Sequence, residues 1–179
     1  MKVMKSIPNM FTLANLYCGF LSIGFSANGH YQQAAIFILI GMLFDSMDGR
    51  LARMLHVDSD FGKQLDSLAD IVTFGIAPSF LVYYIYFFQF GILGFAVAGL
   101  FPLFGAYRLA RFNIQSNNTS INSFTGVPIT AAGGILAMLI LFGSEMSPFV
   151  IIIIFILLCF LMVSKLRIPS FKNISLSKY

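Results

Sequence analysis

Charged residues are scarce in this sequence, and their scarcity excludes an ordinary soluble protein. Only 10% of the 179 residues are Asp, Glu, Lys or Arg, whereas a soluble domain contains roughly 25%. Hydrophobic residues make up 58% of the chain. Because one bilayer crossing needs about 20 apolar residues, the chain has room for several helical spans and little else. We therefore expect a single membrane domain that covers residues 1–179.

Cysteine is also nearly absent, which excludes a disulfide framework and a cysteine metal site. Cys18 and Cys159 lie far apart, each within an apolar stretch, so neither pairing nor ligand spacing is indicated. The basic N-terminus followed by an apolar run resembles a signal peptide. No small-residue cleavage site clearly follows it, so we interpret this run as a retained first helix.

Hydrophobic runs bounded by Gly, Pro, Asn or charge predict an all-α integral membrane protein with six transmembrane helices. The runs cover residues 10–28, 32–54, 64–88, 91–112, 126–143 and 147–164. The eleven Lys and Arg residues flank alternate ends of these runs. By the positive-inside rule, both termini and the charged connections face the cytoplasm. We expect a multi-pass protein of the cytoplasmic membrane.

Acidic residues gather in one region despite their small number. Six of the seven lie between positions 45 and 70. Asp45 and Asp48 are three residues apart in the second predicted helix, and Asp66 and Asp70 are four apart in the third. These spacings place each pair on one helix face. We refer to these four residues as the aspartate cluster.

Carboxylates this close together in a membrane domain need a counter-charge. Inserting each carboxylate into the membrane costs roughly 2.5 to 3.5 kcal/mol on insertion scales, and neighbouring carboxylates repel one another. Protonation or divalent cations would relieve the repulsion. Oxygen ligands without His or Cys favour Mg²⁺ or Mn²⁺, and two such ions would offset four charges. Capping or local pairing at a wetted helix end is the alternative, which we favour only for Asp58 and Asp60.

Residues 45–70 also fit the pattern D-x2-D-G-x2-A-R-x8-G-x3-D-x3-D without a gap. This pattern resembles the signature of the CDP-alcohol phosphatidyltransferases, and the six-helix layout extends the resemblance over nearly all of the chain. The resemblance implies that an alcohol hydroxyl attacks the β-phosphorus of a CDP-linked lipid and that CMP is released. It implies that the aspartate cluster binds two metal ions and that Asp70 is the catalytic base.

The resemblance further implies which residues contact the CDP-linked lipid. Gly49, Ala52 and Gly62 lack bulk and would leave room beside the metal ions for this ligand. Asn9 and Thr12 lie in IPNMFT, which is similar to the start of the family's first helix, and Asn9 is also expected to cap that helix. The full set is Asn9, Thr12, Gly49, Ala52, Arg53, Ser59 and Gly62.

A second polar group, Arg108, Arg111 and Asn113, lies at the end of the fourth predicted helix. Arginines three apart share a helix face, and their forked donors suit a carboxylate or a phosphate. Snorkelling toward anionic lipid headgroups is the alternative. The run RLARFN, with SFTGVP after a polar loop, is similar to the membrane-type phosphatidylserine synthases of this family. That similarity implies L-serine as the acceptor, bound by these three residues.

Other acceptors and other functions stay open at this point. Glycerol 3-phosphate or another polar alcohol would also need arginines, and residues 114–125 receive no role. A cation transporter is a remote alternative, because intramembrane acids also mark ion pathways, but these acids cluster at one membrane face. A non-catalytic assembly subunit would be expected to carry a broken motif, and here the motif is whole.

The expected partners follow from the family reading. The expected ligands are CDP-diacylglycerol, L-serine and membrane lipids. The resemblance to the family also implies a homodimer, and no nucleic acid is expected as a partner. The active site is expected to face the cytoplasm, where the basic connections lie.

Overall fold

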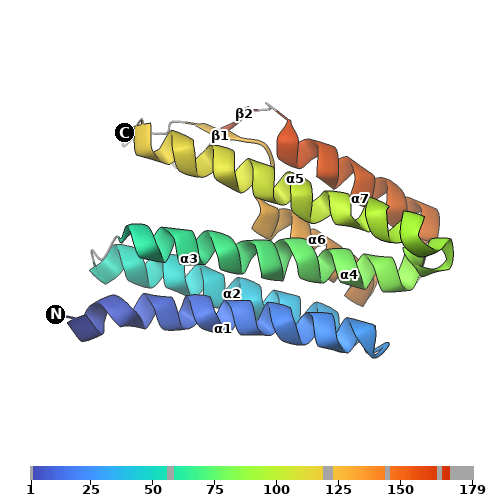
Figure 1. Cartoon of the computed structure of the whole chain (residues 1–179), viewed down its shortest axis with the longest axis horizontal. Coiled ribbons are helices and arrows are strands. Elements are labelled where there is room, and N and C mark those ends of the chain that lie inside the picture. The colour runs from blue at the N-terminus through green and yellow to red at the C-terminus, as the bar shows by residue number, and fades with distance from the viewer. Residues whose placement is uncertain (1, 56–58, 119–122, 144–145, 165–166, 170–179) are drawn as a thin grey trace, which may run out of the picture.

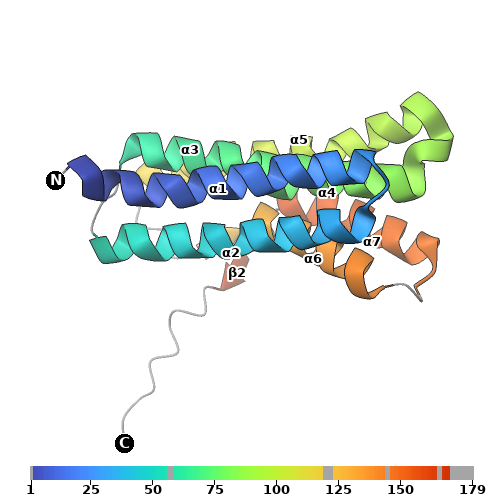
Figure 2. The ribbon, with the colours of Figure 1, turned by 90° about the horizontal axis from the view of Figure 1, so that it is seen from below.

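The computed structural model is a bundle of long helical rods that run side by side (Figures 1 and 2). It describes residues 2–55, 59–118, 123–143, 146–164 and 167–169. Helices α1 (Lys2–Ala27) and α2 (Tyr31–Leu55) form an antiparallel pair. The turn between them uses Gly29 at φ 77°, a backbone conformation that glycine adopts without strain.

The third rod is continuous but changes its helical form along its length. It consists of α3 (Asp60–Asp70), a π-helical turn η1 (Ile71–Ile76), α4 (Ala77–Val82), a second π-helical turn η2 (Tyr83–Phe87) and a short 3-10 turn η3 (Phe88–Phe90). π-Helical turns are rare and often mark functional sites. The first one directly follows the last residue of the aspartate cluster, Asp70.

The remaining rods are α5 (Gly91–Asn118), α6 (Ile129–Phe142) and α7 (Pro148–Val163). Helix α5 packs on α7, and α6 packs on α2. Between α5 and α6, strand β1 (Ser123–Thr125) pairs antiparallel with β2 (Arg167–Pro169), which follows α7. In the described part of the chain, six rods thus lie where six helical runs were predicted. The all-α prediction is confirmed, and the small ribbon in the connection after α5 is an addition to it.

Two predicted helix boundaries are wrong. Helix α1 begins at Lys2, so Asn9 lies inside the helix and does not cap it. Helix α5 continues to Asn118, well beyond residue 112. Hydropathy marks where an apolar segment ends, whereas a helix continues as long as its backbone groups remain paired.

The largest fully buried side chains among the described residues are phenylalanines. Phe74, Phe101 and Phe155 are buried almost completely, and the rings of Phe101 and Phe155 stack with centroids 5.2 Å apart. Large apolar side chains also cover the outside, including Ile92 at 78% exposure and Phe149 at 76%. An outer surface of this kind suits lipid as the surrounding solvent.

Two stretches of the described chain are helical, long and apolar enough to cross a bilayer. They are Asn9–Ala27 and Asp60–Ile114, the second of which contains the third rod and most of α5. Helices α6 and α7 are apolar but have only 14 and 16 residues, which at 1.5 Å per residue is less than the ~30 Å hydrocarbon thickness. The number of spans therefore stays a prediction.

Gly133 of α6 marks a close helix crossing beside η1. A Cβ atom at this position would lie 2.5 Å from the carbonyl oxygen of Phe74 and 2.9 Å from its Cα. We expect Gly133→Ala to lower the free energy of unfolding by about 1–3 kcal/mol, because the backbone of the neighbouring rod must move. Thermal unfolding of the detergent-solubilised protein measures this change.

The matched control for this prediction is Gly99→Ala in α5, where an added Cβ would meet nothing within 4 Å. This control should melt at or slightly above the wild-type temperature, because alanine favours a helix over glycine. Equal melting temperatures for the two variants would show that the crossing at Gly133 is not tight.

Candidate metal and substrate site

The aspartate cluster brings together residues from the second half of α2 and from the last two turns of α3. One carboxylate oxygen each from Asp45, Asp66 and Asp70 lie within 4.8 Å of one another. Asp48 is buried beside them, and the hydroxyl of Thr12 in α1 donates a hydrogen bond to it. The charge of Asp48 acts on Asp66 as well as on Asp45. The structure therefore brings together the two pairs that the sequence places on separate helices.

The donor set of this group fits hard divalent cations. All of its ligand atoms are carboxylate oxygens, which Mg²⁺ and Mn²⁺ prefer. Opposite ligands on one Mg²⁺ lie roughly 4.2 Å apart, twice the metal–oxygen distance, so Asp45, Asp66 and Asp70 need only a small movement to share one ion.

Among the described residues, the negative charge of the cluster is largely uncompensated. Asp48 and Asp70 are each only 7% exposed, and Oδ1 of Asp70 has no hydrogen-bond partner among the described residues. Arg108 of α5 is itself buried and is the cation whose charge acts on Asp70. One guanidinium cannot balance four carboxylates in a low-dielectric site. A bound cation would supply the missing positive charge.

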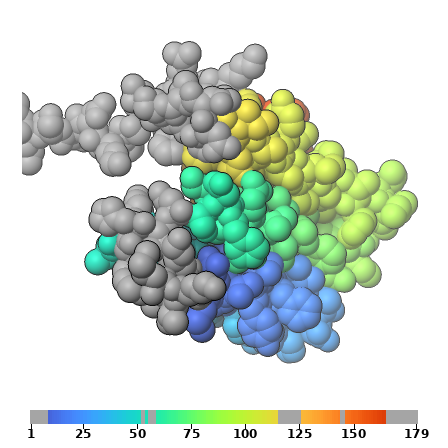
Figure 3. Space-filling model, turned by 60° about the vertical axis from the view of Figure 1, so that its left-hand side comes forward, coloured from blue at the N-terminus to red at the C-terminus, as the bar shows by residue number. Residues whose placement is uncertain are grey.

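Residues expected to contact the CDP-linked lipid meet at the start of α3. The Oγ of Ser59 accepts a hydrogen bond from the backbone N–H of Gly62 at 3.0 Å and caps the helix. A Cβ on Gly62 would lie 3.4 Å from Oδ1 of Asn9 in α1. This group lies one helical turn before Asp66. Viewed toward this end, the surface of α3 lies between those of α1 and α5 (Figure 3).

Thr12 of this predicted set lies on α1 and contacts Asp48, and the remaining members lie on α2. Gly49 is exposed and directly follows Asp48. The side chains of Ala52 and Arg53 lie outside the described part of the chain. Their predicted contacts therefore stay predictions.

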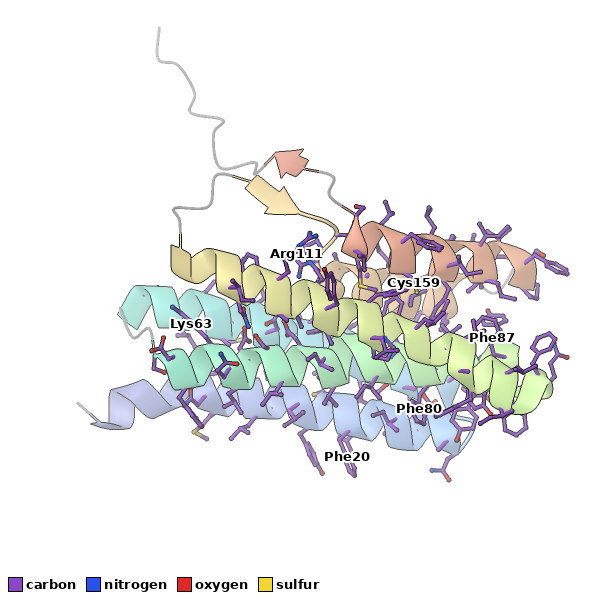
Figure 4. The ribbon with its side chains drawn as sticks, turned by 45° about the horizontal axis from the view of Figure 1, so that its top comes forward. Phe20, Lys63, Phe80, Phe87, Arg111 and Cys159 are labelled. Carbon is purple, nitrogen blue, oxygen red and sulfur yellow. The ribbon has the colours of Figure 1, made fainter. Side chains whose placement is uncertain are left out.

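The three predicted acceptor residues do not converge on one point. Arg108 faces Asp70, with its guanidinium carbon 5.8 Å from the ring centroid of Phe112. Arg111 points toward α7 (Figure 4), where its Nη2 lies 3.5 Å from the carbonyl oxygen of Ser164. These directions differ because residues three apart on a helix are offset by about 60° around its axis.

Asn113 makes a third kind of contact. Its Nδ2 donates to Oγ of Ser67 in α3 at 2.9 Å. Ser67 directly follows Asp66, and its hydroxyl also donates to the carbonyl oxygen of Lys63. Asn113 therefore ties α5 to the helix that carries two of the aspartates.

Sequence reasoning missed two buried polar residues next to the cluster. Asn15 of α1 lies beside Asp70, and the hydroxyl of Thr73 in η1 donates to the backbone carbonyl of Asn15 at 2.9 Å. A signal for Asn15 was present, because Asn9, Thr12 and Asn15 recur every three residues along α1. Polar residues at that period mark the inward face of a membrane helix.

An apolar groove of about 520 Å³ lies between α2 and α6. Leu39 and Met42 of α2 line it together with Gly134, Ile135 and Met138 of α6. Met42 is one helical turn before Asp45. Among the lining residues, Met42 is therefore the one nearest in the chain to the aspartate cluster.

Comparison with known proteins gives a consistent result. Residues 5–164 match the family model described as CDP-alcohol phosphatidyltransferase. A CDP-diacylglycerol–serine O-phosphatidyltransferase of Helicobacter pylori (strain ATCC 700392 / 26695) is 37% identical over 173 residues, which is 93% of this chain and 73% of the relative. The corresponding protein of Bacillus subtilis (strain 168) is 38% identical over 170 residues, 95% of this chain and 93% of the relative.

An archaeal relative carries a related name. An archaetidylserine synthase of Methanothermobacter thermautotrophicus is 36% identical over 168 residues, which is 92% of this chain and 70% of the relative. The names of these relatives all contain serine, and they differ in the lipid that they name.

The carboxylate geometry predicts cation binding that does not need the substrates. We expect Asp66→Asn to weaken Mn²⁺ binding at least about tenfold, since loss of even an outer-shell partner costs that much. Asp60→Asn is the matched control, because Asp60 is exposed at the first turn of α3. Electron paramagnetic resonance of Mn²⁺ with the detergent-solubilised protein measures both. Equal affinities for the two variants would contradict the assignment of Asp66 as a ligand.

Proposed function

Because the chain belongs to the CDP-alcohol phosphatidyltransferase family, we propose that it transfers the phosphatidyl group of CDP-diacylglycerol to the hydroxyl of L-serine and releases CMP. The product is phosphatidylserine. The observation that carries this proposal is the position of buried Arg108 beside Asp70, next to a group of carboxylates on two helices. The names of the relatives support serine as the acceptor.

The chemistry of serine matches this arrangement. Only two carbon atoms separate its hydroxyl from its carboxylate, so both groups reach neighbouring residues. Arg108 would bind the carboxylate through its forked donors, and Asp70 would face the hydroxyl. Arg111 and Asn113 would support this binding by holding α5 against α7 and α3.

Transfer then requires one bond to form and one to break. The serine oxygen bonds to the β-phosphorus, the phosphoanhydride bond to CMP breaks, and Asp70 accepts the hydroxyl proton as a general base. We propose that the aspartate cluster holds two Mn²⁺ or Mg²⁺ ions. When bound, they would neutralise charge on the pyrophosphate and on departing CMP.

The donor would lie along the other side of the cluster. Its nucleotide part would contact the group at the start of α3, formed by Asn9, Ser59 and Gly62, together with Thr12, Gly49, Ala52 and Arg53 of α1 and α2. One of its acyl chains would fit the apolar groove between α2 and α6, since Met42, which lines the groove, lies one turn from Asp45. The apolar groove would thus bind the lipid tail, and the polar group at the start of α3 would bind the charged headgroup.

We also propose that the protein crosses the cytoplasmic membrane six times with its active site toward the cytoplasm. The start of α1, the end of α2, the start of α3 and the end of α5 lie at one end of the bundle (Figure 1). These ends carry most of the Lys and Arg residues, which supports a cytoplasmic location. Residue 1 and residues 170–179 lie outside the described chain, so the sides of the termini stay predictions. A homodimer stays a prediction from resemblance.

A panel of alcohols tests the acceptor. Purified protein with Mn²⁺ or Mg²⁺ and CDP-diacylglycerol should release CMP and form phosphatidylserine when labelled serine is added. Glycerol 3-phosphate is the informative competitor, because a guanidinium also binds phosphate. Turnover of glycerol 3-phosphate without turnover of serine would move the chain to the phosphatidylglycerophosphate branch of the same chemistry.

Arg108→Lys tests how the acceptor is held. Lysine keeps the charge near Asp70 but loses the forked geometry, so we expect the KM for serine to rise at least about tenfold while the KM for CDP-diacylglycerol stays within about threefold. Arg111→Lys is the matched control and should raise the serine KM by less than about threefold, because Arg111 faces α7. Equal increases for the two variants would contradict the role of Arg108.

A further inference from the structure

Asn15 is a fully buried amide on α1, three residues after Thr12. Residues at this spacing share a helix face, so both face the aspartate cluster. Thr12 donates to Asp48 of α2, and Asn15 lies beside Asp70 of α3. Helix α1 therefore supplies one neutral polar side chain to each of the two helices that carry the carboxylates.

The position of Asn15 is fixed on two sides. Oγ1 of Thr73 donates to its backbone carbonyl at 2.9 Å. A Cβ at Gly41 of α2 would lie 2.8 Å from Oδ1 of Asn15, so the amide oxygen lies against bare helix backbone. The amide nitrogen is thereby left on the side of Asp70.

Unpaired polar atoms meet at this point. Among the described residues, neither Nδ2 nor Oδ1 of Asn15 has a hydrogen-bond partner, and Oδ1 of Asp70 lacks one too. Buried polar groups are nearly always paired, so unpaired ones need a functional or structural reason. A slightly closer approach of Nδ2 to Asp70 Oδ1 would satisfy two of these atoms together.

We propose that Asn15 is a positioning residue for Asp70: in the working site its Nδ2 donates to Oδ1 and fixes the plane of the carboxylate. The inference rests on the proposed function, in which Asp70 is the base. With Oδ1 held, Oδ2 stays directed at the cation and at the acceptor hydroxyl. A neutral donor suits this task, because a charged donor would bind the carboxylate more strongly and make it a weaker base.

The first test is Asn15→Ala, assayed at saturating Mn²⁺. We expect kcat to fall about 10- to 100-fold, while the KM values for serine and CDP-diacylglycerol change less than about threefold. Ser22→Ala is the matched control, because Ser22 is also fully buried on α1 with an unpaired hydroxyl but lies two helical turns away. Its kcat should stay within about twofold of wild type. Asp70→Asn gives the lower limit of kcat, because it removes the proposed base.

The second test separates positioning from packing and does not alter Asn15 itself. Thr73→Val keeps the shape of a buried side chain and removes the hydroxyl that holds Asn15, whereas Thr73→Ser keeps the hydroxyl and removes a methyl group. Positioning predicts a higher kcat for Thr73→Ser than for Thr73→Val. The reverse order would follow from packing alone and would overturn the proposal, even if Asn15→Ala fails to fold.

Mn²⁺ binding without either substrate is the third measurement. Asn15→Ala should bind Mn²⁺ about tenfold more weakly, as expected for losing an outer-shell partner of a ligand. Unchanged Mn²⁺ affinity, or a kcat restored to the wild-type value by saturating Mn²⁺, would overturn the proposal. If the wild-type protein does not use serine, only the proposed acceptor is refuted. The role of Asn15 can still be tested, because the variants can be assayed with the alcohol that the wild type does use and can be compared by Mn²⁺ binding.

Discussion

Mutual repulsion among buried and half-buried carboxylates is the constraint on which the rest of this structure depends. Asp45, Asp66 and Asp70 present oxygens within 4.8 Å of one another in an apolar bundle, where charges interact more strongly than in water. Thr12 gives Asp48 a hydrogen bond, and Arg108 places one positive charge near Asp70. Neither contact removes the excess negative charge. The same excess would favour binding of cations and, through them, of a pyrophosphate.

Close helix crossings hold these charges together. A Cβ at Gly19 of α1 would lie 2.8 Å from the Cα of Thr73, and one at Gly41 of α2 would lie 2.6 Å from its Cγ2. Thr73 belongs to the π-helical turn η1, so α1, α2 and the third rod meet around it. Lipid tails are as apolar as the helices, so close packing of this kind drives helix association in membranes. The rigid crossing keeps the carboxylates from moving apart.

The proposed reaction joins a lipid to a water-soluble amino acid, and the layout suits both. Met42, which lines the apolar groove between α2 and α6, lies one turn from Asp45. Arg108 approaches Asp70 from α5, on a different rod. A donor anchored in the bilayer and an acceptor arriving from water would then reach the cluster from different directions. The end of a helix bundle at a membrane surface is where both are present.

The sequence alone predicted the six helical runs, because apolar length and turn residues are local properties. It also predicted the aspartate cluster, since helical periodicity places Asp45 with Asp48 and Asp66 with Asp70. Two of its predictions are wrong, namely Asn9 as a helix cap and the end of α5 at residue 112, because hydropathy does not follow backbone hydrogen bonding.

Tertiary structure decided which side chains face one another. It joined Asp45 to Asp66 and Asp70, turned Asp48 toward Thr12, and directed Arg108, Arg111 and Asn113 to three different places. It also buried Asn15 beside Asp70 and formed the π-helical turn at Thr73. These features depend on how close helices approach and at what rotation. Residues distant in the chain set both, so no local pattern in the sequence encodes them.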